Sequence, residues 1–266
     1  MKRRRFLGTT LGASTALAHA AAKSQDSPPG NLRIFLLAGQ SNMAGRGKIA
    51  PADREPHPRV WSFAADSEWQ PATAPLHFDK PKIAGVGPGR AFGIALAEQY
   101  PDRPVGLVPC AVGGSPLKSW EPGAEYEALG VHPYDDAIRR TQAALANGTL
   151  SGILWHQGES DAGNPEDAAT YADRLADLIQ RFRADLDAPG LPFLVGELGR
   201  FPDRAWTDPE NPVNRAHREV AKTVPNCAWV SAEDLTPMSD GTHFDAKSAR
   251  ELGRRYAEVW VEKFGA

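Results

Sequence analysis

Short apolar runs alternate with amphipathic segments along most of this chain, and that alternation limits the fold more than any other feature. The runs have the length of buried strands, and the segments between them repeat apolar residues at helical spacing. We predict strands at residues 31–38, 105–112, 150–156, 192–198 and 227–231, and helices at 89–100, 134–146, 165–186, 212–224 and 244–264. Because β-α alternation builds parallel sheets, we predict an α/β protein, a three-layer αβα sandwich around a parallel five-stranded sheet.

Residues 45–88 depart from this pattern and are rich in Pro, Trp and His. We expect a long excursion there, with a small hairpin around residues 60–63 and Trp69, because long loops at the edge of a parallel sheet commonly shape a ligand cleft. The loops around Trp61, Trp69, Trp120 and Trp206 suit a sugar ligand, since aromatic faces pack on sugar rings; burial in the core is the alternative.

The first twenty residues have the pattern of an export signal. A basic start, Lys2 to Arg5, precedes a weakly apolar segment that ends in the small-x-small sequence Ala18-His19-Ala20. The run Arg3-Arg4-Arg5 resembles a bacterial twin-arginine signal, and the apolar part is too short to span a bilayer. We therefore predict a signal peptide over 1–20, a flexible lead-in over 21–30, one domain over 31–266, and a periplasmic or secreted protein.

Charge and cysteine content narrow the class of protein further. Cleavage after residue 20 would leave 26 of the 30 Lys and Arg against all 33 Asp and Glu, a formal net charge of −7. Such a balance argues against nucleic acid or an anionic membrane as the partner. Cys110 and Cys227 both lie in apolar, strand-like contexts, where free buried cysteine is common, and a disulfide between them is the alternative.

The apolar run before Ser41 stops abruptly at Gly39 and is followed by Gln40, Ser41 and Asn42. This places the Ser41 hydroxyl at the carboxyl end of the sheet, beside backbone N–H groups that can face a developing negative charge. A helix N-cap or turn serine is the alternative. The sequence G-x-S-x-G of α/β-hydrolases is absent, because Met43 stands at the last glycine position.

Two further blocks follow later strands. In "AVGGSPLKSW" the Gly114 N–H is a candidate donor to an oxyanion, with a tight turn as the alternative. In "LWHQGESD" the Gln157 amide is a candidate side-chain donor to the same oxyanion. His156 and Glu159 also invite a metal interpretation, but two ligands without a third make it weak, and a structural hydrogen-bond network is the stronger alternative.

The block "SDGTHFD" precedes the last predicted helix and places Asp240 and His243 three residues apart. An Asp so placed can hold the Nδ1–H of the ring and leave Nε2 free to take a hydroxyl proton, whereas an Asp cap beside a surface histidine is the alternative. Because strand ends in a parallel sheet share one crevice, a single site explains all four blocks where separate structural roles would need four explanations.

The blocks "LLAGQSNMAGRG", "GVGPGRAFGIALA", "VPCAVGGSPLKSW", "WHQGESD" and "DGTHF" resemble the sialate O-acetylesterase-like and acetylxylan esterase proteins of carbohydrate esterase family 6, within the SGNH hydrolase superfamily. The resemblance covers the chain from about residue 31 to the last helix. It implies a flavodoxin-like fold, Ser41 as nucleophile, His243 as base and Asp240 as its partner. The oxyanion donors would be the Ser41 and Gly114 amides and the Gln157 side chain, with Glu159 as a rival or additional orienter of His243.

This resemblance implies a secreted esterase that removes O-acetyl groups from carbohydrate without a metal or organic cofactor. Acetylated xylan is the first candidate substrate, and 9-O-acetylated sialic acid is the alternative. A non-catalytic glycan-binding module on the same fold is a further alternative. Nucleotide binding at "GVGPG" is discounted, since its spacing differs from G-x-G-x-x-G and no strong strand precedes it. The sequence leaves the oligomeric state open.

Overall fold

A computed structural model describes residues 28–202, 204, 206–208 and 210–265. Its centre is a seven-stranded sheet in the order β3-β2-β4-β1-β5-β6-β7, in which every neighbouring pair is parallel except β2 and β3. The predicted signal peptide lies outside the described residues. The strands are β1 (Leu32–Gly39), β2 (Val60–Phe63), β3 (Trp69–Pro71), β4 (Val105–Pro109), β5 (Gly148–His156), β6 (Phe193–Gly196) and β7 (Cys227–Val230).

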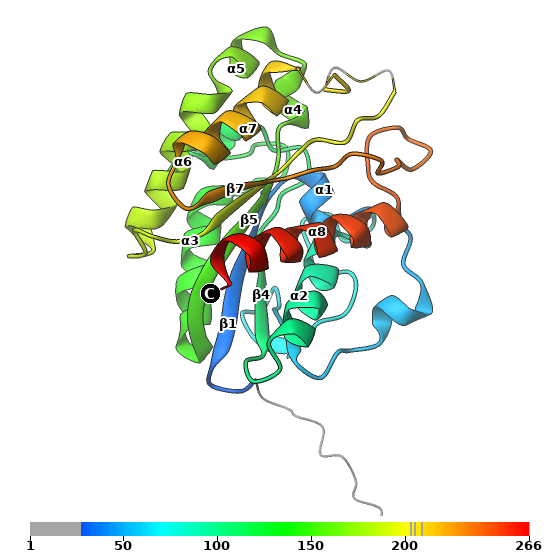
Figure 1. The fold of residues 1–266 in the computed structure, drawn as a ribbon, viewed down its shortest axis with the longest axis vertical. Helices are drawn as coiled ribbons and strands as arrows, with labels where there is room; N and C mark the ends of the chain where they lie inside the picture. Colours follow the sequence, from blue (N-terminus) through cyan, green and yellow to red (C-terminus); the bar gives the residue numbers. More distant parts are fainter. Residues whose placement is uncertain (1–27, 203, 205, 209, 266) are drawn as a thin grey trace, which may run out of the picture.

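Helices cover both faces of this sheet. Figure 1 shows α3, α6 and α7 on one side and α2 and α8 on the other. The longer helices are α2 (Pro88–Gln99), α3 (Pro133–Ala144), α6 (Tyr171–Asp185), α7 (Pro212–Thr223) and α8 (Ala246–Phe264). Short ones are α1 (Ser41–Ala44), α4 (Glu159–Ala162), α5 (Pro165–Ala169) and the 3₁₀ turns η1 (Pro51–Arg54), η2 (Leu117–Trp120) and η3 (Leu145–Asn147). The predicted α/β class and its layers are thus observed.

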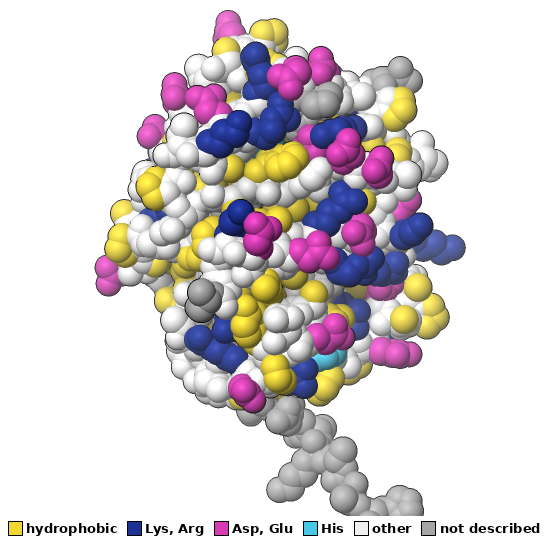
Figure 2. Space-filling view, in the orientation of Figure 1, with side chains coloured by type: hydrophobic (Ala, Val, Ile, Leu, Met, Phe, Trp, Pro, Cys, Tyr) yellow, Lys and Arg dark blue, Asp and Glu magenta, His cyan; other side chains and the backbone are white. Residues whose placement is uncertain are grey.

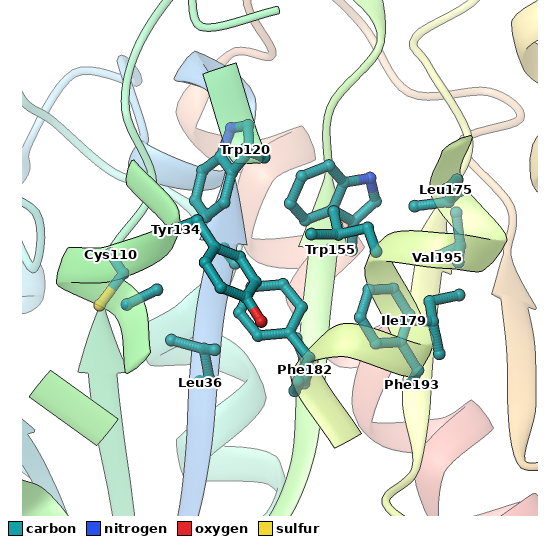
Figure 3. Packing of buried hydrophobic residues seen from close by; sticks show 14 of the residues in the cluster. Leu36, Cys110, Trp120, Tyr134, Trp155, Leu175, Ile179, Phe182, Phe193 and Val195 are labelled. Atoms are coloured by element: carbon teal, nitrogen blue, oxygen red, sulfur yellow. The ribbon is translucent and has the colours of Figure 1, made fainter. Parts of the chain in front are cut away.

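Strand β1 explains why the core has two halves. Leu32, Ile34 and Leu36 point into the cluster beneath α3, α6 and α7, while Phe35 and Leu37 point into the cluster beneath α2 and α8. A strand buried on both faces must be apolar at successive positions, which is why this run does not alternate with polar residues. Figure 3 shows the first cluster, where aromatic rings fill the space between sheet and helices.

The prediction of a parallel five-stranded sheet was wrong in its strand count and in its uniform direction. All five predicted strands are present, but the hairpin expected near Trp69 joins the same sheet as β2 and β3. Val60 pairs with Val105 of β4, and β3 turns back along β2 as the antiparallel edge. An antiparallel edge strand on a parallel sheet is a common way to end it.

The helix predicted over 165–186 is divided into α5 and α6 at Thr170. The Thr170 hydroxyl donates to the carbonyls of Glu166 and Asp167, at 3.2 and 3.4 Å, and its backbone leaves helical geometry. Threonine competes with helical backbone bonding in this way. The last helix begins at Ala246 rather than 244, because the Asp245 side chain accepts from the Ser248 N–H and caps it.

The face of the molecule drawn in Figure 2 carries basic and acidic side chains side by side, without a field of one sign. Nucleic acid is attracted to a protein surface by a basic field. The expectation that nucleic acid is not the partner stays a prediction. None of the helices among the described residues is long and apolar enough to span a membrane. Cys110 and Cys227 are both free, so the structure has no bridge between them.

Candidate active site

Ser41 opens α1 directly beyond the end of β1. Gly39 pairs with His156 across the sheet, and a Cβ on Gly39 would lie 2.2 Å from the His156 carbonyl oxygen, at a φ of +124° that side chains rarely adopt. The sharp turn after β1 therefore requires glycine at this position. It presents the Ser41 hydroxyl at the carboxyl edge of the sheet, where ligands bind in open α/β folds.

The structure brings His243 to this serine from 202 residues away. Its Nε2 lies 3.0 Å from Ser41 Oγ, and its Nδ1 lies 2.8 Å from Asp240 Oδ2. Asp240 Oδ1 also accepts from the backbone N–H groups of Thr242 and His243. Burial alone would raise the pKa of Asp240, but these hydrogen bonds outweigh it and hold that pKa at about 2. Asp240 is therefore an anion at neutral pH and fixes the ring with Nε2 toward the hydroxyl.

Glu159 does not contact the His243 ring. It accepts from Asn42 Nδ2 at 2.6 Å, and Asn42 in turn donates to the Thr242 carbonyl and accepts from the Phe244 N–H, at 3.2 and 3.0 Å. Asn42 thus holds the backbone on both sides of His243, and Glu159 fixes Asn42. Of the two carboxylates that the sequence offered, Asp240 is the one in contact with the imidazole. Sequence reasoning missed the role of Asn42.

Gly114 lies in the loop after β4 with a φ of +88°, which favours glycine. Among the described residues, neither the Gly114 N–H nor the Ser41 N–H has a hydrogen-bond acceptor, so both can donate to a ligand. The neighbouring Gly113 N–H donates to Asp79 Oδ2 at 2.8 Å. Asp79 is also paired with Arg46, at 2.6 Å, so one buried ion pair joins the loop of the serine to the loop of the glycine.

The Gln157 side chain does not lie where a donor to an oxyanion would have to lie. It is fully buried, and its Nε2 is within 3.1 Å of oxygens on Gln40, Ser115 and Asp161, three acceptors for two hydrogens. The Tyr171 hydroxyl donates to its Oε1. In this geometry the amide holds the serine loop and the glycine loop together and has no hydrogen left for an oxyanion. Periodicity predicted the strand end but not this network.

Two further expectations from the sequence concern His156 and the tryptophans of the loops. His156 is fully buried 3.9 Å from Glu159, and burial lowers its pKa to about 3, so it is neutral. No cluster of three or more His, Cys, Asp and Glu side chains within the described ranges could hold a metal ion. The sugar-contact role expected of the tryptophans is not supported, because they are core residues, with 3, 9, 0 and 8% of their surface exposed: Trp61, Trp69, Trp120 and Trp206. The four ambiguous blocks thus supply the residues of one site and of a hydrogen-bond network that supports it.

The "GVGPG" block, residues 85–89, packs against this site. The N–H groups of Gly85 and Val86 donate to the carbonyls of Gly45 and Gly47, at 3.0 and 2.8 Å, just beyond the Ser41 helix. Its glycines therefore serve close contact between two backbone segments rather than a phosphate.

Comparison with known proteins decides the family. Residues 31–262 match the family described as carbohydrate esterase, sialic acid-specific acetylesterase. The chain belongs to this carbohydrate esterase family. A protein of Arabidopsis thaliana named as a probable carbohydrate esterase is 32% identical over 254 residues, which are 87% of this chain and 91% of that protein. The human sialate O-acetylesterase is 33% identical over 165 residues, which are 48% of this chain and 31% of that enzyme.

Solved structures agree with the carbohydrate esterase fold. The X-ray structure of the Arabidopsis protein superposes with a TM-score of 0.78 and covers 89% of this chain and 100% of that one, at 32% identity. NanS, at 20% identity, has a TM-score of 0.67 over 88% of this chain and 98% of its own, which shows the same fold. Family membership makes this protein an esterase of carbohydrate esters.

Proposed function

We propose that this carbohydrate esterase removes O-acetyl groups through an acyl-enzyme intermediate on Ser41. The observation that carries the proposal is the hydrogen-bonded series Ser41 Oγ, His243 and Asp240, with contacts of 3.0 and 2.8 Å. A hydroxyl, an imidazole and a carboxylate in this order are the parts that nucleophilic acyl transfer requires.

In the first step, His243 Nε2 takes the Ser41 proton as the oxygen attacks the acetyl carbonyl. The resulting oxyanion accepts from the Ser41 and Gly114 N–H groups, neither of which has an acceptor among the described residues. His243 then gives its proton to the departing sugar oxygen. Water repeats the sequence on the acetyl-serine and releases acetate, which restores the Ser41 hydroxyl. Asp240 stays ionised throughout and stabilises the imidazolium.

A direct test compares the wild-type protein with Ser41→Ala on p-nitrophenyl acetate. The variant should lose about 10⁶ in kcat, the scale seen when a serine nucleophile is removed. A fluorophosphonate should label Ser41 in the wild-type protein, and a chelator should leave the rate unchanged. Near-normal hydrolysis by the variant, or loss of activity with chelator, would refute the mechanism; a binding module would show neither labelling nor turnover.

For the substrate, we propose an acetylated acidic sugar such as 9-O-acetylated sialic acid. Lys80 Nζ and the Tyr126 hydroxyl lie 3.9 and 2.8 Å from the point where a Cβ on Gly114 would stand, so a cation flanks the proposed oxyanion donor. A carboxylate on the sugar would be attracted to that ammonium. Acetylated xylan, which is neutral in its backbone, is the comparison substrate. A panel read out by released acetate decides between them, and equal rates on both would contradict a role of charge.

We also propose export by the twin-arginine route, on the basis of Arg3-Arg4-Arg5 and the small-x-small sequence that follows. The full chain expressed in bacteria should appear outside the cytoplasm, and replacing Arg4 and Arg5 by Lys should retain it inside. Unchanged fractionation of that variant would contradict the route.

A further inference from the structure

Two large apolar side chains are markedly exposed among the described residues, and both lie in the last part of the 45–88 excursion. Phe78 has 38% of its surface exposed and Ile83 has 56%. The Phe78 ring lies against the Arg140 guanidinium, whose carbon is 4.8 Å from the ring centroid. Arg140 is itself buried and donates to the carbonyls of Phe63 and Ala64. The ring of Phe78 is therefore held outward on a fixed support.

A cavity of about 200 Å³ lies beside Phe78. Its wall is apolar at Ala111 and Val131 and charged at Asp136 and Arg139. His77 also lines it and is itself buried. Because burial lowers the pKa of His77 to about 4, the ring is neutral and carries one donor and one acceptor. Asp136 and Arg139 pair with each other at 2.9 Å, so the cavity combines an apolar wall with a polar rim, which is the usual form of a small-molecule site.

Asp79 also lines this cavity, and with Lys80 it links the cavity to the glycine loop of the proposed active site. Asp79 accepts the Gly113 N–H at 2.8 Å, and Lys80 Nζ lies 3.9 Å from the Cβ position on Gly114. Consecutive Cα atoms are about 3.8 Å apart, so Phe78 stands within two such steps of residues that touch the glycine loop. Ile83, by contrast, does not line this cavity.

We propose that Phe78 and this cavity form a subsite for the sugar ring that carries or adjoins the acetyl ester. A pyranose has an apolar C–H face and a hydroxyl-bearing edge. The C–H face packs on the Phe78 ring, and the hydroxyls exchange hydrogen bonds with Asp136, Arg139 and His77 inside the cavity. This inference rests on the proposed esterase function. It assigns to Phe78 the sugar contact that was expected of the tryptophans, which are buried.

The test compares Phe78→Ala with the matched control Ile83→Ala, which removes a more exposed apolar side chain from the same segment. Each is assayed on an acetylated oligosaccharide and on methyl acetate, whose alcohol is too small to reach the ring. Phe78→Ala should lower kcat/KM for the oligosaccharide about tenfold, mainly through KM, which corresponds to ~1.4 kcal/mol. Methyl acetate hydrolysis should stay within about twofold, Phe78→Tyr should restore most of the loss, and Ile83→Ala should change neither substrate.

Two results would overturn the subsite while leaving the esterase proposal intact. Unchanged oligosaccharide kinetics in Phe78→Ala would show that the ring makes no sugar contact. Equal losses on both substrates would show that Phe78 only supports the Asp79 contact with Gly113. A wild-type protein that cleaves methyl acetate but no acetylated glycan would instead refute the carbohydrate substrate, and the subsite with it.

Discussion

The buried ion pair between Arg46 and Asp79 joins the two loops that form the proposed site, and its loss should be costly. Arg46 Nη2 and Asp79 Oδ2 are 2.6 Å apart, and only 4 and 2% of their side chains are exposed. Burial alone would raise the pKa of Asp79, but the Arg46 hydrogen bond and charge outweigh it and lower that pKa, so the carboxyl is ionised. Each partner alone would be an uncompensated charge in the interior.

Removing one partner of a buried pair costs about 3–5 kcal/mol, because the other charge stays buried without a partner. Asp79→Ala also leaves the Gly113 N–H unpaired, which adds about 1–3 kcal/mol. We therefore expect a loss of about 4 kcal/mol or more in unfolding free energy, a large part of the 5–15 kcal/mol typical of native proteins. Arg46→Met should cost about 3–5 kcal/mol for the same reason.

The double variant Arg46→Met/Asp79→Ala removes both charges at once and leaves only the Gly113 N–H unpaired. Its loss should be smaller than the sum of the two single losses by about 2–3 kcal/mol. Urea unfolding followed by tryptophan fluorescence measures all three values. Losses that add within about 0.5 kcal/mol, or single losses below about 1 kcal/mol, would show that the two charges do not depend on each other.

Three further predictions follow from the residues around Ser41. Burial raises the pKa of Glu159 from 4.5 to about 7, so the folded state loses stability as pH rises through this range and the carboxyl ionises beside a neutral His156. Glu159→Gln should remove that loss, which is roughly 3 kcal/mol in the free energy of unfolding between pH 5 and pH 8. An unchanged pH dependence in the variant would contradict the assignment. Asn42→Ala should release the backbone around His243 and lower kcat for p-nitrophenyl acetate about 10²-fold, with little change in KM. A change in KM alone in steady-state assays would argue against a positioning role of Asn42. Gly39→Ala should prevent folding, because its Cβ would meet the His156 carbonyl at 2.2 Å, and a circular dichroism melting curve like that of the wild type would show this reasoning to be wrong.

The parts of the fold that periodicity predicted are those that depend on near neighbours in sequence. Each buried strand and each amphipathic helix is specified by its own residues, so the five strands and the layers could be predicted. The break at Thr170 depends on one hydroxyl competing for two carbonyls, a choice that a hydrophobic pattern does not record. Nor could the pattern show that the hairpin at residues 60–71 would join the sheet, because its partner, β4, lies more than thirty residues further along.

The site divides in the same way. Asp240 and His243 are three residues apart on one turn, so spacing allowed their contact but left Glu159 as a rival partner of the ring, and the structure decided for Asp240. The approach of His243 to Ser41 depends on the parallel sheet that brings their loops to one edge, and only the packed chain could show 3.0 Å between them. For Gln157 the motif was misleading. It suggested an oxyanion donor, but the amide is buried and lies within hydrogen-bond distance of three internal acceptors.

The sequence by itself determined the five main strands, the class of fold and the likeness to carbohydrate esterases, because these are recorded in local pattern and motif. The tertiary structure alone decided which backbone N–H groups are left for a ligand and which polar groups satisfy one another inside. Hydrogen bonds and ion pairs form between segments far apart in the chain, as Arg46 and Asp79 or Asn42 and Glu159 do here, and their partners are fixed only when the core has packed.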